Sequence, residues 1–360
     1  MSKEKEKKKG VLVLEDGSIW HGYSYGIEGK VEGEVVFNTG MVGYVESLTD
    51  PSYKGQILCQ TYPLIGNYSF CKDFFESDGI KVEGYLVREL CALPSHYKSN
   101  KPLLKWLVKE NIPYLEGIDT RELTKKLRVR GTMLGILCIG DYDIKELKKK
   151  ARCIWDPNKE DLVRKVTIKE PVIYGDGKKR IAVIDCGVKM GIINSLLERG
   201  MQVLRVPATF TAERIMDLSP EAVLISNGPG DPRKADYVIK TAKELVEYKI
   251  PLMGICLGHQ IIALALGMQT YKMKFGHRGQ NHPVIMSNGR CFITSQNHGF
   301  AVKEERMKDI EILFKSLNDN SVEGIRHKKM PIIGVQFHPE ARPGPNDTNF
   351  LFDEFLRWIR

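Results

Sequence analysis

The sequence predicts an α/β protein of two domains, in which a mixed, β-rich first half precedes a second half built on a mostly parallel β-sheet. A chain of 360 residues exceeds the usual size of one domain. Between residues 180 and 266, short apolar runs alternate with helical segments, a pattern typical of parallel strands joined by helices. Before residue 90, glycine-rich turns separate strand-like runs instead, which favours a β-rich region.

The first half begins with a predicted β-hairpin, because Asp16-Gly17 separates two apolar runs. Further along, Pro102 suits the first turn of a helix. Asp119 and Gly131 are suited to cap the two ends of another helix. The predicted strands cover residues 11–14, 19–21, 34–38, 56–61 and 84–88, and the predicted helices cover 102–109 and 120–130.

The second half changes rhythm near residue 180, where strands and helices alternate with short loops. This pattern predicts a parallel sheet of the doubly wound kind. After residue 282 the sequence becomes β-rich, and a last helix is predicted from Asp347-Thr348 to about Trp358. The predicted strands cover 181–185, 202–206, 222–226, 251–255, 284–286, 291–294, 312–317, 322–326 and 332–337, and the predicted helices cover 191–198, 211–217, 234–248 and 261–266.

Composition sets the predicted boundaries. Residues 1–10 are charged and lack an apolar segment, so we expect a disordered arm rather than a secretory signal. Residues 11–155 form the predicted first domain. Residues 156–179 hold prolines and glycines among charges and are predicted to be a linker. Residues 180–360 form the predicted second domain.

Several classes of protein are disfavoured. The net charge is +9, but the basic residues are dispersed, so no nucleic acid is expected as a partner. No apolar run approaches the ~20 residues of a membrane helix. The eight cysteines include no C-x-x-C pair, so we expect no metal site and reduced thiols in a cytoplasmic protein. Neither a phosphate loop nor G-x-G-x-x-G occurs, so no nucleotide site is predicted on this chain.

Cys256 is the predicted nucleophile. It lies between a predicted strand and a predicted helix, and Gly254 and Gly258 flank it at two residues on each side. This is the cysteine form of a nucleophile elbow, in which glycines leave room for a sharp turn. The helix N-terminus favours thiolate over thiol. A lone cysteine in an apolar run is more often a core residue, but the two glycines and the strand-to-helix position favour the elbow.

A nucleophilic cysteine needs a base and a group that orients the base. His338 and Glu340 follow the last predicted strand and are two apart in an extended segment, so their side chains can meet. His259, one helical turn after Cys256, is predicted to be structural, as are His282 and His298. Backbone N–H groups of Gly230 and Leu257 are the candidate oxyanion hole.

Three motifs of the second half resemble class I (triad) glutamine amidotransferases, which implies a flavodoxin-like domain that hydrolyses glutamine through a thioester. They are GICLGHQ (254–260), SNGPGDP (226–232) and QFHPE (336–340). Five further segments resemble the small subunit of carbamoyl phosphate synthetase, so that the resemblance covers nearly the whole chain. They are GEVVFNTGMVGY (33–44), LTDPSYKGQI (48–57), DTRELTKKLR (119–128), MKFGHRGQNHP (273–283) and SQNHGFAV (295–302).

The resemblance implies roles for individual residues. Cys256 would be the nucleophile, His338 the base and acid, and Glu340 its orienting group. The residues implied to hold L-glutamine are Ser52, Gly228, Gly230, Leu257, Gln260, Asn297, Gly299 and Phe300. Ser52 comes from the first domain, so the resemblance places the site at a domain junction. The sequence departs from the family at Cys186 and Gly191, where Phe and Asn are usual.

The resemblance also implies a partner, the large subunit of the synthetase. ATP, Mg and bicarbonate would belong to that subunit, no cofactor would bind this chain, and the first domain would serve docking. The product would enter arginine and pyrimidine biosynthesis. The alternatives are the glutaminase subunit of another triad amidotransferase, of the anthranilate or GMP type, a non-catalytic regulatory subunit, and a cysteine peptidase. The first of these leaves residues 1–160 unexplained.

Overall fold

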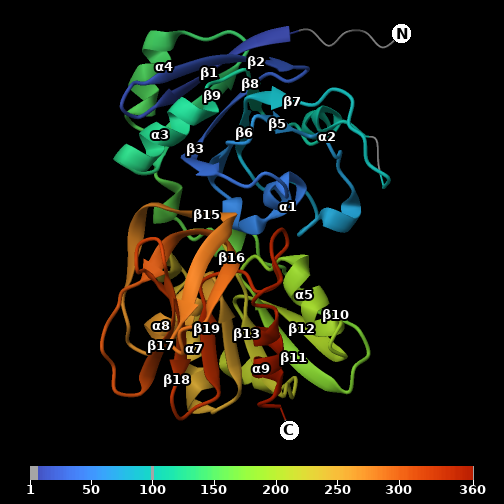
Figure 1. Cartoon of the computed structure of the whole chain (residues 1–360), viewed down its shortest axis with the longest axis vertical. Coiled ribbons are helices and arrows are strands. Elements are labelled where there is room, and N and C mark those ends of the chain that lie inside the picture. The colour runs from blue at the N-terminus through green and yellow to red at the C-terminus, as the bar shows by residue number, and fades with distance from the viewer. Residues whose placement is uncertain (1–6, 99–100, 360) are drawn as a thin grey trace. The chain divides into compact units, whose positions relative to one another are not determined.

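The computed structural model describes residues 7–98 and 101–359 and divides into two compact units (Figure 1). The first unit covers Met1–Glu160 and the second covers Asp161–Arg360. Within the described residues, no helix is both long enough and apolar enough to cross a membrane.

The first unit is built on a closed β-barrel. Antiparallel pairing of β1 with β9, which sets Leu12 opposite Leu137, closes the ring. Around the ring the strands are β1 (Lys7–Leu14), β2 (Ile19–Tyr25), β8 (Tyr114–Glu116), β6 (Gly84–Val87), β4 (Gln56–Gln60), β3 (Gly29–Asn38) and β9 (Met133–Ile139). A small separate sheet pairs β5 (Leu64–Ile65) with β7 (Glu89–Leu90).

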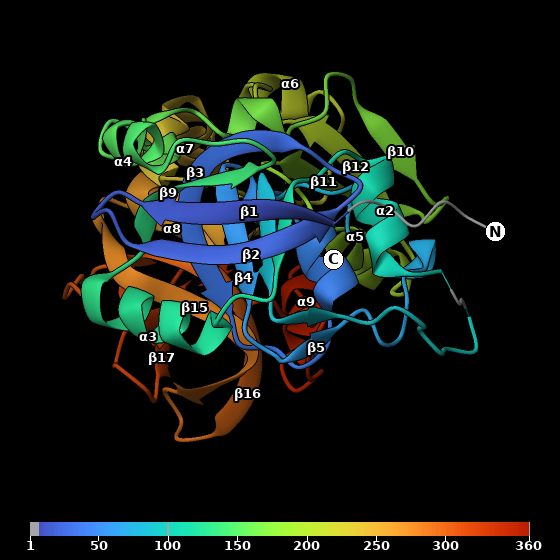
Figure 2. The ribbon, with the colours of Figure 1, turned by 90° about the horizontal axis from the view of Figure 1, so that it is seen from above.

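Within the described residues, the first unit has four α-helices around the barrel, as Figure 2 shows for α2, α3 and α4. They are α1 (Tyr44–Thr49), α2 (Leu103–Lys109), α3 (Thr120–Arg130) and α4 (Ile144–Ala151). The predicted caps of α3 are confirmed. The Asp119 side chain accepts a hydrogen bond from the Glu122 N–H, and Gly131 ends the helix at a φ of 105°. Such a φ favours glycine.

The first unit also differs from the sequence-based prediction. Residues 7–10 belong to β1 and are not part of a disordered arm, whereas residues 1–6 lie outside the described residues. The sequence analysis missed β8, β9 and α4, and it did not predict that the sheet closes. Closure depends on the pairing of strands far apart in sequence, such as β3 with β9, which local patterns do not report.

The second unit contains a ten-stranded mixed sheet. Its parallel part runs β12–β11–β13–β14–β19, and the other strands join antiparallel to their neighbours. In sheet order the strands are β10 (Val172–Tyr174), β12 (Met201–Pro207), β11 (Lys179–Asp185), β13 (Ala222–Ile225), β14 (Leu252–Ile255), β19 (Ile332–Val335), β18 (Val322–His327), β16 (Cys291–Val302), β15 (Thr270–Met286) and β17 (Ile310–Ser316).

Helices cover both faces of the parallel part. Strand β11 shows this by its alternation: Ala182 and Ile184 belong to one core cluster, while Ile181 and Val183 belong to the other. The first cluster includes residues of α6 (Ala212–Met216), α7 (Asp236–Glu247) and α8 (Leu257–Ala265). The second includes residues of α5 (Met190–Leu197) and α9 (Phe350–Leu356). The predicted doubly wound arrangement is therefore confirmed.

Two predictions in the second half need correction. The proposed linker at 156–179 is partly ordered structure, because β10 pairs with β12 and the Ile168 N–H donates to the Asp185 carboxylate at 2.8 Å. The last helix begins at Phe350 rather than at Asp347. In addition, β15 extends over seventeen residues, and its many polar and glycine residues gave no strand signal in the sequence before residue 284.

Candidate active site

Cys256 occupies a strained turn between β14 and α8. Its backbone has a φ of 54° and a ψ of −104°, a conformation that non-glycine residues rarely adopt. A Cβ on Gly254 would lie 2.5 Å from the carbonyl carbon of Gly258, and a Cβ on Gly258 would lie 2.0 Å from the Ile225 carbonyl oxygen. Both flanking positions therefore require glycine, as the elbow pattern predicts.

The Cys256 side chain is almost fully buried, and its Sγ lies 3.7 Å from the Asn297 carbonyl oxygen. The Cys256 N–H donates to the Val335 carbonyl at 2.8 Å, which fastens the elbow to β19. The residue is the N-cap of α8, so the positive end of that helix lies beside the thiol. This position favours the thiolate.

Sheet order brings the predicted catalytic segments to one edge. Strand β14 lies between β13 and β19, and all three run parallel. Cys256 follows β14, His338 follows β19, and the loop with Gly228 and Gly230 follows β13. Carboxyl ends of adjacent parallel strands share an edge, which is where open α/β sheets bind ligands.

His338 is held by two contacts. Its Nδ1 lies 2.6 Å from Glu340 Oε1, and its backbone N–H donates to the Ser295 carbonyl at 2.9 Å. A carboxylate accepts, so the proton of the neutral ring is on Nδ1, and Nε2 keeps its lone pair. The buried Nε2 makes no hydrogen bond within the described part of the chain. The ring is thus prepared to accept a proton at Nε2.

Glu340 is fully buried beside Lys189 and His338. Burial by itself raises its pKa, but Lys189 and His338 outweigh this effect and lower the pKa to about 2. Lys189 Nζ lies 2.9 Å from Glu340 Oε1, and both side chains are buried. Glu340 therefore stays ionised at neutral pH.

The sequence analysis missed Lys189. It follows β11, in the stretch that departs from the family pattern, and it contacts Glu340 151 positions away. The position of Lys189 after a central parallel strand is the only signal that could have indicated its role.

The two departures themselves are accommodated by packing. Cys186 is fully buried in a core cluster, and its N–H donates to Ser226 Oγ at 3.0 Å. Burial raises the pKa of the Cys186 thiol well above its usual value, so this thiol stays protonated. Gly191 is a buried residue of α5.

The residues predicted to hold glutamine lie in four places. Leu257 and Gln260 belong to the first turn of α8, and the loop after β13 supplies the two glycines. The Gln260 side-chain amide donates to the Phe300 carbonyl at 2.8 Å and to Gln336 Oε1 at 3.0 Å. Asn297, Gly299 and Phe300 belong to β16. Ser52 belongs to a short 3-10 helix, Pro51–Tyr53, of the first unit.

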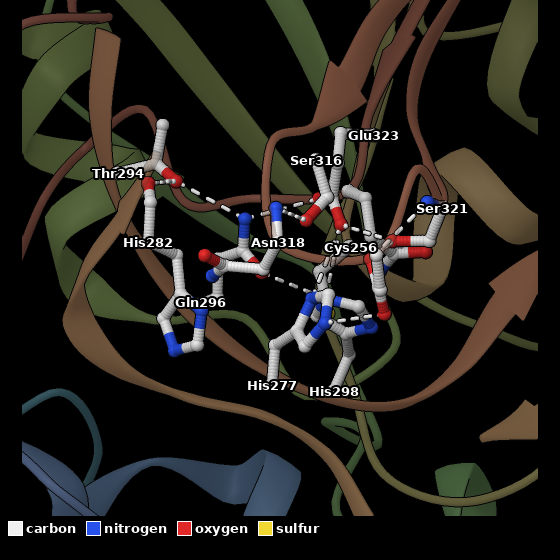
Figure 3. Close-up of polar contacts among 12 residues, drawn as sticks. Cys256, His277, His282, Thr294, Gln296, His298, Ser316, Asn318, Ser321 and Glu323 are labelled. Atoms are coloured by element: carbon white, nitrogen blue, oxygen red, sulfur yellow. Dashed lines mark hydrogen bonds and ion pairs between the residues drawn. The ribbon is translucent and has the colours of Figure 1, made fainter. Parts of the chain in front are cut away.

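A network of buried His277, His298 and Glu323 with exposed Asp319, here called the histidine cluster, supports β16 (Figure 3). His277 Nδ1 lies 3.2 Å from Glu323 Oε1, and its Nε2 lies 3.0 Å from Asp319 Oδ2. Burial by itself would lower the pKa of His277, but the two carboxylates outweigh this effect and raise the pKa to about 9. His277 is therefore a cation at neutral pH.

The cluster reaches β16 through two alternate residues. Glu323 Oε2 accepts from the Gln296 amide at 3.1 Å, and His298 Nδ1 donates to the Phe300 carbonyl at 2.9 Å. Residues of a strand alternate between its faces, so Asn297, between these two, points to the opposite face. Ligand atoms of His277, His298 and Glu323 lie within 4.8 Å of one another, but both ring nitrogens of His277 already face carboxylates.

His259 lies apart from these contacts. It is fully buried, and a Cβ on Gly334 of β19 would lie 2.7 Å from its Nδ1. Burial lowers its pKa to about 3, so the ring is neutral. This position between α8 and β19 supports the structural role that the sequence suggested.

Two family models match the chain. The model for glutamine amidotransferase class-I matches residues 182–358, and the model for the carbamoyl-phosphate synthase small chain, CPSase domain, matches residues 12–137. The second unit thus has the fold and the sequence of a class-I glutamine amidotransferase. Because the other model matches the first unit, the chain as a whole belongs to the family of carbamoyl phosphate synthase small chains.

Curated relatives agree over nearly the whole length. The carbamoyl phosphate synthase small chain of Archaeoglobus fulgidus is 49% identical over 357 residues, which cover 98% of this chain and 99% of that protein. That of Methanocaldococcus jannaschii is 51% identical and covers 97% and 98%. That of Saccharolobus solfataricus is 47% identical and covers 98% of each. The predicted resemblance is confirmed for both halves, and the alternative families are not favoured.

Proposed function

We propose that this chain is the glutamine-hydrolysing subunit of carbamoyl phosphate synthase and passes ammonia to a large subunit. One observation carries the chemical part of the proposal: Cys256 stands on a strained elbow at the sheet edge where His338, held by Glu340, also emerges. Nucleophile, base and orienting group are the parts that acyl transfer requires.

In the first half of the reaction, His338 Nε2 takes the proton of the Cys256 thiol. The thiolate attacks the side-chain amide carbon of L-glutamine, and the carbonyl oxygen becomes an oxyanion. Backbone N–H groups of Gly230 and Leu257 stabilise that oxyanion. When the tetrahedral intermediate collapses, the C–N bond breaks, His338 donates its proton to the nitrogen, and ammonia leaves a thioester on Cys256.

In the second half, His338 takes a proton from water, and the resulting hydroxide attacks the thioester carbonyl. The C–S bond breaks, glutamate leaves, and the proton returns to the Cys256 sulfur. Throughout, Glu340 keeps the proton of the neutral ring on Nδ1, and Lys189 keeps Glu340 ionised. The residues proposed to hold the substrate are Ser52, Gly228, Gly230, Leu257, Gln260, Asn297, Gly299 and Phe300.

The large subunit completes the proposal. It would hold ATP, Mg and bicarbonate, while this chain needs no cofactor for amide hydrolysis. Ammonia that escaped into water would largely be protonated and lose nucleophilicity, so a closed route between the subunits makes chemical sense. Residues 11–155 would serve docking and residues 180–360 hydrolysis. A cytoplasmic location, suggested by eight free cysteines, belongs to this proposal.

The test is Cys256→Ser in the assembled synthase. We expect glutamine-dependent synthesis to be abolished, while synthesis from added ammonia continues at the wild-type rate. Cys291→Ser, at an exposed cysteine of the same unit, is the matched control and should leave both activities intact. Substantial glutaminase activity in Cys256→Ser would refute the assignment of the nucleophile.

A further inference from the structure

The first unit contains a hollow that the proposed glutamine chemistry does not use. It has a volume of about 650 Å³ and is lined by residues of α3, by Arg88 at the end of β6 and by residues after β4. The DTRELTKKLR segment, residues 119–128, supplies most of this lining. That segment helped to identify the family, yet no step of hydrolysis requires it.

The lining is strongly cationic, and we call it the basic hollow. Its cations are Arg88, Arg121, Lys125 and Arg128. None of the four forms an ion pair with any residue in the ranges 7–98 and 101–359. On the same helix, Lys126 lies outside the lining and pairs with Asp16 at 2.6 Å. The hollow therefore gathers four cations whose charge no ion pair within the described residues compensates.

Placing these cations close together lowers the stability of α3. Arg121, Lys125 and Arg128 are spaced i, i+4 and i+7, so they form one stripe along α3. Like charges four residues apart destabilise a helix. Arg88 adds a fourth cation, and its guanidinium donates its only hydrogen bond within the described residues to the Gly117 carbonyl, at 3.3 Å. An acidic partner outside this chain would compensate these charges.

The same contacts decide what kind of anion fits. The only carboxylate in the lining, Asp119, accepts from the Glu122 N–H and so occupies the N-terminus of α3, where a phosphate would otherwise bind. The four cations are exposed, and three of them, Arg121, Lys125 and Arg128, are spread over two turns of α3. Several carboxylates on an extended surface match this stripe better than one compact anion does.

We propose that the basic hollow is a docking site for an acidic segment of the large subunit. The inference rests on the proposed function, which supplies the partner, and it adds the surface and the chemistry of recognition. Exposed charges of this kind mainly raise the association rate, and salt weakens their effect.

Charge reversal tests the proposal. The variant is Arg121→Glu/Lys125→Glu, and its matched control is Lys145→Glu/Lys149→Glu on α4. Both pairs are exposed, spaced i, i+4 and change the charge equally. The two helices contact different strands, α3 on β3 and β4, and α4 on β1 and β9. Association with the purified large subunit is followed at low and at high salt.

We expect the variant in the hollow to bind about tenfold or more weakly at low salt, mainly through slower association, with a smaller difference at high salt. The control should bind as wild type does, and all forms should hydrolyse glutamine equally when alone. A milder variant, Arg121→Gln/Lys125→Gln, should weaken binding in the same direction if the double reversal fails to fold.

Equal binding of the variant and the control at low salt would overturn the inference. So would binding of inorganic phosphate or ATP to the isolated wild-type chain that the variant loses while its affinity for the large subunit stays unchanged, because that result defines a small-anion site. The Cys256→Ser experiment is independent, since a failure there refutes the chemistry and leaves docking intact.

Discussion

At the scale of single residues, strain marks the site. Cys256 adopts a positive φ, for which the two glycines beside it make room, and the fold maintains that conformation through the hydrogen bond to Val335. A strained backbone of this kind costs of order 1–3 kcal/mol and persists where the surrounding structure enforces it. The elbow therefore presents the thiol in a direction that a relaxed strand-to-helix turn would not provide.

His338 and His259 should respond differently to substitution. His338→Asn removes the base, so we expect kcat for glutamine hydrolysis to fall by about 10²–10⁴. His259→Asn should lower thermal stability, because it introduces a polar amide into a buried site, while the folded fraction keeps most of its kcat. Steady-state kinetics together with thermal unfolding separate the two effects. A larger loss of kcat in folded His259→Asn would mean that the base is misassigned.

At the scale of elements, β16 connects a buried ion network to the site. One face carries Gln296, which donates to Glu323 of the histidine cluster, and His298, a member of the cluster, while the strand supplies the Asn297 carbonyl to Cys256. These hydrogen bonds restrain a strand that is proposed to hold glutamine. Contacts on one face of β16 therefore help to position the residues on its other face.

His277→Gln should test this element. The substitution leaves Glu323 buried without its cation, so the free energy of unfolding should fall by about 3–5 kcal/mol. We also expect KM for glutamine to rise more than kcat falls, because β16 is displaced rather than the base removed. A normal KM in folded variant protein would show that the cluster only stabilises the fold.

The pH dependence follows from the raised pKa of His277. A group whose pKa is higher in the folded state contributes stability that is present in full below the unfolded value, near 6.5, and is lost as the pH rises through about 9. Wild-type stability should therefore decline between about pH 6.5 and 9, and His277→Gln should show a flatter profile. Chemical unfolding at several pH values measures this, with His21→Gln, at an exposed histidine, as the control.

At the scale of the whole molecule, the division of labour between the units leads to a kinetic prediction. The second unit carries Cys256, His338 and Glu340, so the isolated chain should hydrolyse glutamine slowly. Binding of the large subunit should accelerate hydrolysis, because a small misplacement of oxyanion donors can cost about 10²-fold and docking can correct it. Turnover is measured with glutamine alone and after the large subunit and its nucleotide are added. Equal turnover would exclude such coupling.

Local pattern in the sequence determined a large part of this protein. The alternation of 181–185 with its neighbours predicted the parallel sheet, because buried strands and amphipathic helices have different periods. Asp119 and Gly131 predicted the ends of α3 through cap chemistry. The glycines around Cys256 predicted the elbow through the room that a sharp turn requires. Each of these inferences depends on interactions within about ten residues.

Only the tertiary structure decided the rest. The closed barrel needs β1 to pair with β9 across more than a hundred residues, and no local signal encodes that register. Lys189 reaches Glu340 from another strand, and His277 lies between carboxylates that follow it by more than forty residues. Electrostatic contacts of this kind are set by which strand ends meet at a sheet edge, a consequence of topology that single-sequence patterns do not contain.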